Sequence, residues 1–187
     1  PIGDQTMLEN YKKHVAERAE QNIPPLPLDA DQTSELIKLL KEDHQESDFL
    51  LNLLKERVPA GVDQAAYVKA AFLADITTGK TSSPYITKID AVKILGTMLG
   101  GYNIQPLIEC LKDNELAETA AHVLSRTLLI FDAFNEIFEL SKTNEHAKKV
   151  VEEWANATWF TEKTDIEEQI KLTVYKVTGE INTDDLS

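Results

Sequence analysis

Apolar side chains recur at helical spacing along most of this chain. A run without proline or glycine at residues 7–21 follows the capping-box spacing of Thr6 and Glu9, and a proline-rich connector at residues 22–27 ends it. Apolar stripes with i, i+3, i+4 spacing then predict helices over residues 29–41, 49–58, 62–78, 87–99, 103–111, 114–124, 128–140 and 144–157. The pattern therefore predicts an all-α fold.

Several residue types mark the expected ends of these helices. Helix-starting side chains are predicted at Asp29 or Asp31, at Thr87 with Asp90 in a capping box, at Asn103 and at Asn114. Gly79 is expected to end its helix in a left-handed conformation, and the glycine pair at residues 100–101 is expected to end the helix that begins near residue 87. Within that helix the predicted buried face consists of Ile89, Val92, Leu95 and Leu99.

The connections between the predicted helices are short, and no heptad pattern continues beyond one helix. This combination indicates stacked antiparallel helix pairs rather than a coiled coil. We expect a HEAT-like stack, a right-handed superhelix in which each helix pair completes the core of its neighbour. Because the segments share little internal similarity, an irregular helical bundle remains an alternative from periodicity alone.

Near the end of the chain, polar and apolar side chains alternate with a period of two instead of the helical spacing. Residues 171–177 (KLTVYKV) alternate polar and apolar side chains and precede a turn signal at Thr178 and Gly179. They predict one strand, whose sheet partners we expect outside this chain. Since Met7 is a plausible start, residues 1–6 are expected to be either an added remnant or part of a longer natural N-terminus. Residues 7–163 are expected to form a HEAT-like helical domain, and residues 164–187 a linker with the first strand of a swivelling domain.

Composition narrows the classes of function. The 187 residues include 42% hydrophobic and 27% charged ones, which is typical of a globular chain. Nineteen Lys and Arg against 32 Asp and Glu give a net charge of −13, which repels nucleic-acid phosphates and anionic lipid. No apolar run reaches the roughly 18 residues of a membrane span and no signal-peptide pattern opens the chain, so we expect a cytoplasmic protein without membrane contact.

The side chains show no recognisable catalytic or metal-binding pattern. Cys110 is the only cysteine, which excludes a metal cage built from cysteines, and its apolar neighbours predict a packing role. The histidines lack the i, i+4 spacing of a metal-binding pair and are expected at the surface or hydrogen-bonded in the core; they are His14, His44, His122 and His146. The aromatic residues Phe131, Phe134, Phe138, Trp154, Trp159 and Phe160 are predicted to lie in the core. We therefore predict no catalytic residue, no metal and no cofactor in this chain.

Four segments of the chain are distinctive strings. They are residues 8–18 (LENYKKHVAER), 57–70 (RVPAGVDQAAYVKA), 95–104 (LGTMLGGYNI) and 176–187 (KVTGEINTDDLS). Together and in this order they resemble the N-terminal part of the bacterial aconitate hydratase B family. The resemblance runs from about Met7 to Ser187, and it implies a HEAT-like helical domain, which agrees with the helices expected from periodicity.

The resemblance also implies a function. Its parent enzymes are lyases of the tricarboxylic acid cycle that interconvert citrate and isocitrate through cis-aconitate, and often also handle 2-methylisocitrate. Their four-iron, four-sulfur (4Fe-4S) cluster is held by three cysteines of the C-terminal part, which Cys110 does not match, so the fragment alone is expected to be inactive. The partners implied are the remaining domains of the enzyme, a second copy in a homodimer, and messenger RNA when iron is depleted. The resemblance also implies that this domain helps to form a passage toward the active site.

Five residues near the end are site-adjacent candidates by this resemblance. They are Asn182, Thr183, Asp184, Asp185 and Ser187, which resemble the active-site-facing start of the swivelling domain, although the substrate-binding arginine expected shortly downstream is absent. Two alternatives to a non-catalytic lyase domain stay open. One is a free-standing helical-repeat adaptor that binds a protein or peptide in a groove, and the other is an RNA-binding module.

Overall fold

The computed structural model describes residues 2–127, 133–162, 168–174 and 179. The chain divides into two compact units, one made of Pro1–Pro27 with Thr164–Ser187 and the other of Leu28–Lys163. Within the described residues all regular structure is helical, apart from one isolated bridge between Ser83 and Ile86. The predicted all-α fold is thus confirmed. No helix in this described part has the length and apolarity needed to cross a bilayer.

The first unit contains helix α1, Ile2–Glu20. The helix begins four residues before the Thr6 capping box predicted from the sequence, because residues 2–5 contain no proline and can extend it. The connector after it folds back along α1 through three hydrogen bonds. Tyr11 Oη donates to the carbonyl of Leu26 at 2.8 Å, Arg18 Nε donates to that of Pro24 at 2.8 Å, and the Leu26 amide donates to His14 Nε2 at 2.9 Å.

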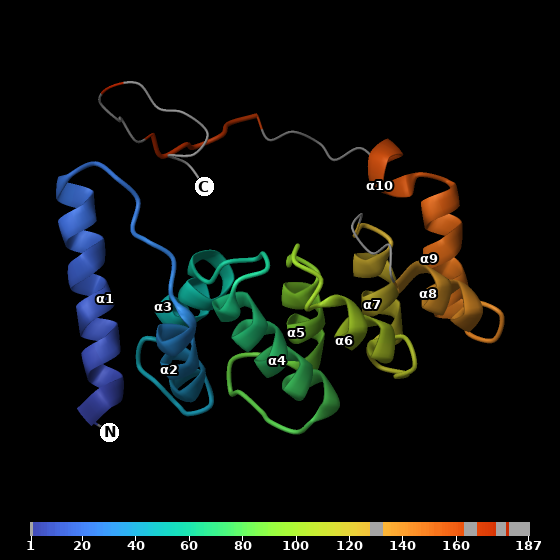
Figure 1. Cartoon of the computed structure of the whole chain (residues 1–187), viewed down its shortest axis with the longest axis horizontal. Coiled ribbons are helices and arrows are strands. Elements are labelled where there is room, and N and C mark those ends of the chain that lie inside the picture. Colours follow the sequence, from blue (N-terminus) through green and yellow to red (C-terminus); the bar gives the residue numbers. More distant parts are fainter. Residues whose placement is uncertain (1, 128–132, 163–167, 175–178, 180–187) are drawn as a thin grey trace. The chain divides into compact units, whose positions relative to one another are not determined.

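The second unit is a series of short helices. Their bounds are α2 Ala30–Leu40, α3 Ser47–Asn52, the π-helical turn η1 Leu53–Arg57, α4 Gln64–Thr78, α5 Lys88–Leu95, α6 Ile104–Cys110, α7 Ala117–Leu124, α8 Phe134–Leu140, α9 Glu145–Ala155 and α10 Thr158–Thr161. Contacts join helices that are close in the sequence: α2 with α4, α4 with α5, α5 and α6 with α7, and α7 and α8 with α9. Figure 1 shows α2 to α9 following one another in chain order. This neighbour-to-neighbour packing is the pattern expected of stacked helix pairs.

The core of this unit consists mainly of leucines on the facing sides of neighbouring helices. Fully buried examples are Leu36, Leu40, Leu50, Leu54, Leu73, Leu95, Leu107 and Leu124. Most lie at the i, i+3 or i+4 positions that the sequence pattern marks as inward-facing. Burying each leucine side chain stabilises the fold by about 1.5–3 kcal/mol before entropy is subtracted. The helical stripes are therefore used in contacts between helices.

Three of the predicted helix ends are confirmed. Asp29 and Gln32 form a capping box before α2, and Thr87 and Asp90 form another before α5. Gly79 has a φ of 76° and ends α4. In each case a side-chain oxygen or a left-handed glycine satisfies backbone groups that the helix leaves unpaired.

Two other predicted caps are wrong. The Asn103 side chain does not cap α6, because its Nδ2 instead donates to the carbonyls of Leu95 at 2.8 Å and Met98 at 3.0 Å. Asn114 does not begin α7 either. Asp113 Oδ1 accepts hydrogen bonds from the amides of residues 115 and 116, and the helix starts at Ala117.

Helix α5 is shorter than predicted, and its apolar stripe is only partly buried. Val92 and Leu95 are buried, but Ile89 and Leu99 are 42% and 70% exposed. The helix ends at Leu95 because the chain then turns, and the amide of Leu99 donates to the carbonyl of Ala60 at 2.7 Å. A β-carbon on Gly100 would overlap the backbone of Gly61, so this glycine lets the two loops approach closely.

The predicted C-terminal strand is not formed at residues 171–174, the part of it that the structure describes. A strand needs a neighbour to pair with, and no described residue pairs with this segment. The side chains of Leu172 and Val174 are 76% and 84% exposed. Residues 175–177 of the predicted strand lie outside the described part of the chain.

Candidate functional site

The histidines do not assemble into a catalytic or metal site within the described residues. His14 Nε2 accepts the amide hydrogen of Leu26, and His44 Nδ1 accepts that of Glu46 at 3.1 Å. His122 is exposed, and His146 is half-buried. In the part of the chain that the structure describes, no three or more His, Cys, Asp or Glu residues lie close enough together to hold a metal ion. The observed positions agree with the surface and hydrogen-bonded roles expected for histidine.

Cys110 is a buried packing residue, as predicted. It lies at the end of α6, is 4% exposed and forms no disulfide. Burial raises the pKa of its thiol, and a hydrogen bond with the Thr77 side chain opposes that effect. A raised pKa keeps the sulfur protonated, whereas a metal ligand or nucleophile needs the thiolate. One buried thiol does not fit the three-cysteine set of an iron–sulfur cluster, so no chemistry of such a cluster is assigned to these residues.

A pocket lined by both charged and apolar residues opens between η1, α4 and α5. Its volume of about 470 Å³ lies within the usual range of small-molecule sites. The lining residues are Lys55, Glu56, Ala60, Lys69, Asp90, Lys93, Ile94 and Thr97. A second pocket of about 500 Å³ shares Lys93 with the first and is lined also by Glu118, Thr119, His122, Val123 and Lys149. Both pockets are therefore lined in part by lysine side chains.

Lys69 is the unusual member of the first pocket, and it is not among the candidate residues predicted from the sequence. It lies on α4 and is only 1% exposed. A signal was present, because Lys69 is four residues after Ala65 and three before Phe72, both of which are buried on the same helix. A lysine on the apolar stripe of a helix is expected to be buried. Burial lowers the pKa of Lys69 to about 8, while the nearby charge of Glu56 raises it.

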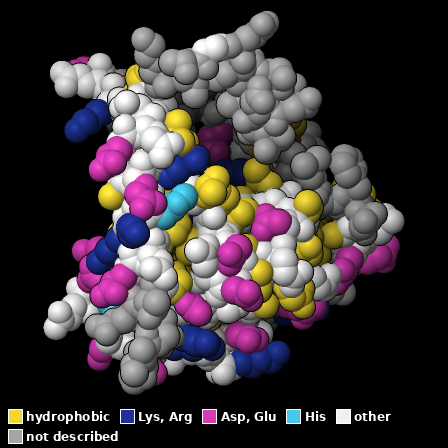
Figure 2. All heavy atoms as spheres, turned by 60° about the vertical axis from the view of Figure 1, so that its left-hand side comes forward, with side chains coloured by type: hydrophobic (Ala, Val, Ile, Leu, Met, Phe, Trp, Pro, Cys, Tyr) yellow, Lys and Arg dark blue, Asp and Glu magenta, His cyan; other side chains and the backbone are white. Residues whose placement is uncertain are grey.

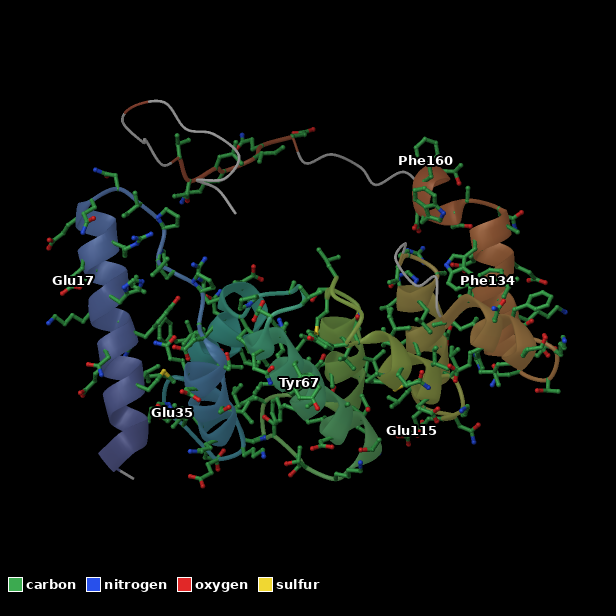
Figure 3. The ribbon with its side chains drawn as sticks, in the orientation of Figure 1. Glu17, Glu35, Tyr67, Glu115, Phe134 and Phe160 are labelled. Carbon is green, nitrogen blue, oxygen red and sulfur yellow. The ribbon has the colours of Figure 1, made fainter. Side chains whose placement is uncertain are left out.

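The predicted aromatic core is wrong for most of its members. Phe134 and Phe138 on α8 are 45% and 44% exposed, and Trp159 and Phe160 on α10 are 42% and 76% exposed. Figure 3 shows Phe134 and Phe160 on their helices. Trp154 is half-buried, and Phe131 lies outside the described residues. Phe134 stacks on Phe138 at 6.2 Å and on Trp154 at 5.8 Å between ring centroids, so these rings contact one another while remaining open to solvent. Helical spacing placed Phe134 and Phe138 on a stripe, but α9 covers that stripe only in part.

Arg126 fixes the position of α10. Its Nη1 contacts Glu153 of α9 at 3.3 Å, and its Nε donates to Glu162, just after α10, at 3.0 Å. Trp154 Nε1 also donates to the carbonyl of Leu124 at 3.2 Å, which joins α9 to α7. The contact with Glu162 ties the end of α10 to Arg126, and the other two contacts tie α9 to the end of α7. The site-adjacent candidates Asn182, Thr183, Asp184, Asp185 and Ser187 lie outside the described residues.

Comparison with known proteins matches residues 10–160 to the aconitate B N-terminal domain. The chain belongs to this family. It is 55% identical over 183 residues to the aconitate hydratase B of Escherichia coli and 54% identical over 184 residues to that of Synechocystis. The corresponding protein of Helicobacter pylori is 47% identical over 182 residues.

These alignments cover 96–97% of this chain but 21% of each relative. The chain therefore spans about one fifth of the length of the curated relatives it matches. It corresponds to the N-terminal domain of aconitate hydratase B proteins, in agreement with the resemblance found in the sequence.

Proposed function

We propose that this chain serves as the non-catalytic N-terminal domain of an aconitate hydratase B, and that it acts through protein contacts. The exposed aromatic rings of α8 and α10 carry this proposal. Large aromatic side chains open to solvent are typical of surfaces that bind another protein, because their burial on binding is strongly favourable. The remaining domains of the parent enzyme and a second copy of the subunit are the partners proposed for this surface.

The chemistry of the parent is proposed to reside outside this chain. The relatives are named for the hydration of aconitate, and the family resemblance implies the interconversion of citrate and isocitrate with a 4Fe-4S cluster. The lone, protonated thiol of Cys110 does not suit that cluster. The domain would therefore support catalysis by holding its neighbours and by bordering the route to their active site.

The charge of the molecule opposes the messenger-RNA role that the resemblance also implies. The net charge is −13, and acidic side chains are spread over the face drawn in Figure 2. Nucleic-acid affinity depends largely on the neutralisation of phosphates by clustered lysine and arginine. Protein contact is for this reason the role that we propose.

Binding between this chain and the separately produced remainder of the parent enzyme tests the proposal. Replacing both exposed α10 rings, in the double variant Trp159→Ser and Phe160→Ser, is expected to weaken binding at least about tenfold in a titration calorimetry experiment. Tyr67→Ser is the matched control, because Tyr67 is 51% exposed on α4 (Figure 3) and should leave the affinity unchanged. Equal losses in both variants would contradict a specific role of α10.

A second measurement concerns activity. The purified 187-residue chain is expected to show no conversion of citrate to aconitate after treatment with iron and sulfide, because the sequence supplies a single thiol. Turnover by this chain alone would overturn the assignment of catalysis to the remainder of the parent.

A further inference from the structure

The buried lysine of the first pocket has no direct charge partner among the described residues. Lys69 is 1% exposed, yet no hydrogen bond or ion pair is found for its ammonium group. The only fully buried side-chain nitrogen or oxygen without a partner in the described chain is Asn103 Oδ1. The Lys69 Nζ atom also lacks a partner in this part of the chain but does not belong to this fully buried set, so it keeps some exposure. It therefore opens on the pocket that its side chain lines.

A buried ammonium group without a direct counter-charge is energetically unfavourable. A buried ammonium loses most of its hydration, and this cost is offset only by an opposite charge or by hydrogen-bond acceptors. With a pKa of about 8, Lys69 is still mostly protonated near pH 7, so the positive charge is present. Glu56 acts on it electrostatically but forms no direct ion pair with it.

The rest of the pocket adds positive charge. Lys55 from η1 and Lys93 from α5 join Lys69, while Glu56 and Asp90 are the acidic lining residues. Three ammonium groups thus face two carboxylates. Asp90 keeps its negative charge: its Oδ2 accepts hydrogen bonds from the Thr87 amide at 3.1 Å and the Thr87 hydroxyl at 2.6 Å, and the charges of Lys93 and Lys55 help to lower its pKa. The pocket is locally cationic in a chain whose net charge is −13.

We propose that the pocket between η1, α4 and α5 binds a small oxyanion, a phosphate or carboxylate group, with Lys69 as its buried contact and Lys55 and Lys93 at its sides. Lysine binds such groups as a point charge with three donors. Ala60 and Ile94 supply apolar wall for the carbon skeleton of an organic anion. Nothing in this proposal depends on the aromatic contact surface of α8 and α10, so it goes beyond the function proposed above.

The experiment is a calorimetric titration of the 187-residue chain near pH 7 and at constant ionic strength. Sodium phosphate is the probe in one arm and sodium succinate in the other, each up to about 10 mM, which is well above a millimolar dissociation constant. Saturable one-to-one binding is expected in at least one arm, and the arm that gives it identifies the oxyanion. Absence of saturable binding in both arms would overturn the proposal.

Matched charge-removing variants locate the site. Lys69→Met, which keeps the length of the side chain, is expected to weaken binding at least about tenfold, and Lys93→Gln about threefold or more. Lys80→Gln is the control, because Lys80 is an exposed lysine outside the pocket and should bind like the unmodified chain. An equal loss with Lys80→Gln would show general charge attraction and refute the site.

Folding of each variant is checked by circular dichroism. Should Lys69→Met lose its helicity, Lys93→Gln decides the matter, because Lys93 is an exposed side chain whose replacement leaves the core intact. Unchanged affinity in a folded Lys93→Gln variant would then place the anion elsewhere. Lys149→Gln tests whether the anion binds in the neighbouring pocket instead, which shares only Lys93 with this one. This variant should leave the affinity unchanged.

Discussion

The α2–α7 part of the helical unit and its α8–α10 part use similar sequence patterns but pack very differently. Helix α4 buries eight of its 15 residues, whereas α8 buries one of seven and α10 none of four. Leucine and alanine fill the first part, while the second carries the large exposed rings of Phe134, Phe138, Trp159 and Phe160. An apolar stripe therefore indicates that a helix has a contact face, but not that this face is occupied within the same chain.

The reason lies in the neighbours of each helix. In the first part, α4 packs on α2 and α5, and α7 packs on α5, α6 and α9. Helix α10, by contrast, contacts mainly α9 and is positioned by the ion pairs of Arg126. A helix with one neighbour leaves most of its surface to solvent or to another partner.

The largest expected difference in the free energy of unfolding comes from placing a carboxylate in each of the two parts. Leu107→Asp puts an unpaired charge at a fully buried position and is expected to destabilise the fold by more than about 4 kcal/mol or to abolish it. Phe160→Asp should change the free energy of unfolding by less than about 0.5 kcal/mol, since this ring is 76% exposed. Urea unfolding followed by circular dichroism measures both variants, and similar losses would show that α10 is packed as tightly as α6.

An intermediate loss of stability is expected at the contact between two loops of the α2–α7 part. Gly100→Ala places a β-carbon against the backbone of Gly61 and should cost about 1–3 kcal/mol. Gly61→Ala is the matched control from the same contact, because its β-carbon would meet nothing within 4 Å. Thermal unfolding of both variants tests this difference, and a neutral Gly100→Ala would mean that the loops can separate without loss.

The smallest expected loss of stability comes from removing one helix cap in each part. Thr87→Ala removes the cap of α5 and should cost about 1 kcal/mol near pH 7, as should Asn144→Ala for α9. Hydrogen bonds from Thr87 lower the pKa of Asp90, so this cap contributes fully above the ordinary carboxyl pKa of about 4 and fades as the pH falls through the lowered value.

Unfolding at a series of pH values distinguishes these two caps. The difference between Thr87→Ala and the unmodified chain should shrink below about pH 4, whereas the effect of Asn144→Ala should not, because its capping oxygen belongs to a neutral amide. A Thr87→Ala effect that is constant down to low pH would indicate that Asp90 does not take part in the cap.

Much of the local structure was predictable from single residues and their spacing. Asp29, Thr87 and Gly79 begin or end helices as expected, because a capping oxygen or a left-handed glycine acts within one helical turn. Asn103 and Leu99 were not predictable in this way. Their roles depend on carbonyl groups of Met98 and Ala60, which approach them only in the folded chain.

The candidate sites were less predictable than the fold. Lys69 could have been recognised from its place on the apolar face of α4, but its pocket is built from three segments that are distant in sequence. The aromatic side chains of α8 and α10 could be assigned to a helical stripe, and only the packing showed that they are exposed.

The sequence by itself determined that this chain is helical, where most of its helices begin and end, and which family it belongs to. Each of these properties depends on residue type and on spacing within a few turns, or on the order of matching strings. Only the tertiary structure decided which apolar stripes are covered, which lysine is buried in a pocket without a direct ion pair among the described residues, and how closely the loops at Gly61 and Gly100 approach. Burial and charge pairing are set by neighbours from other helices, and the spacing of residues along one helix does not specify those neighbours.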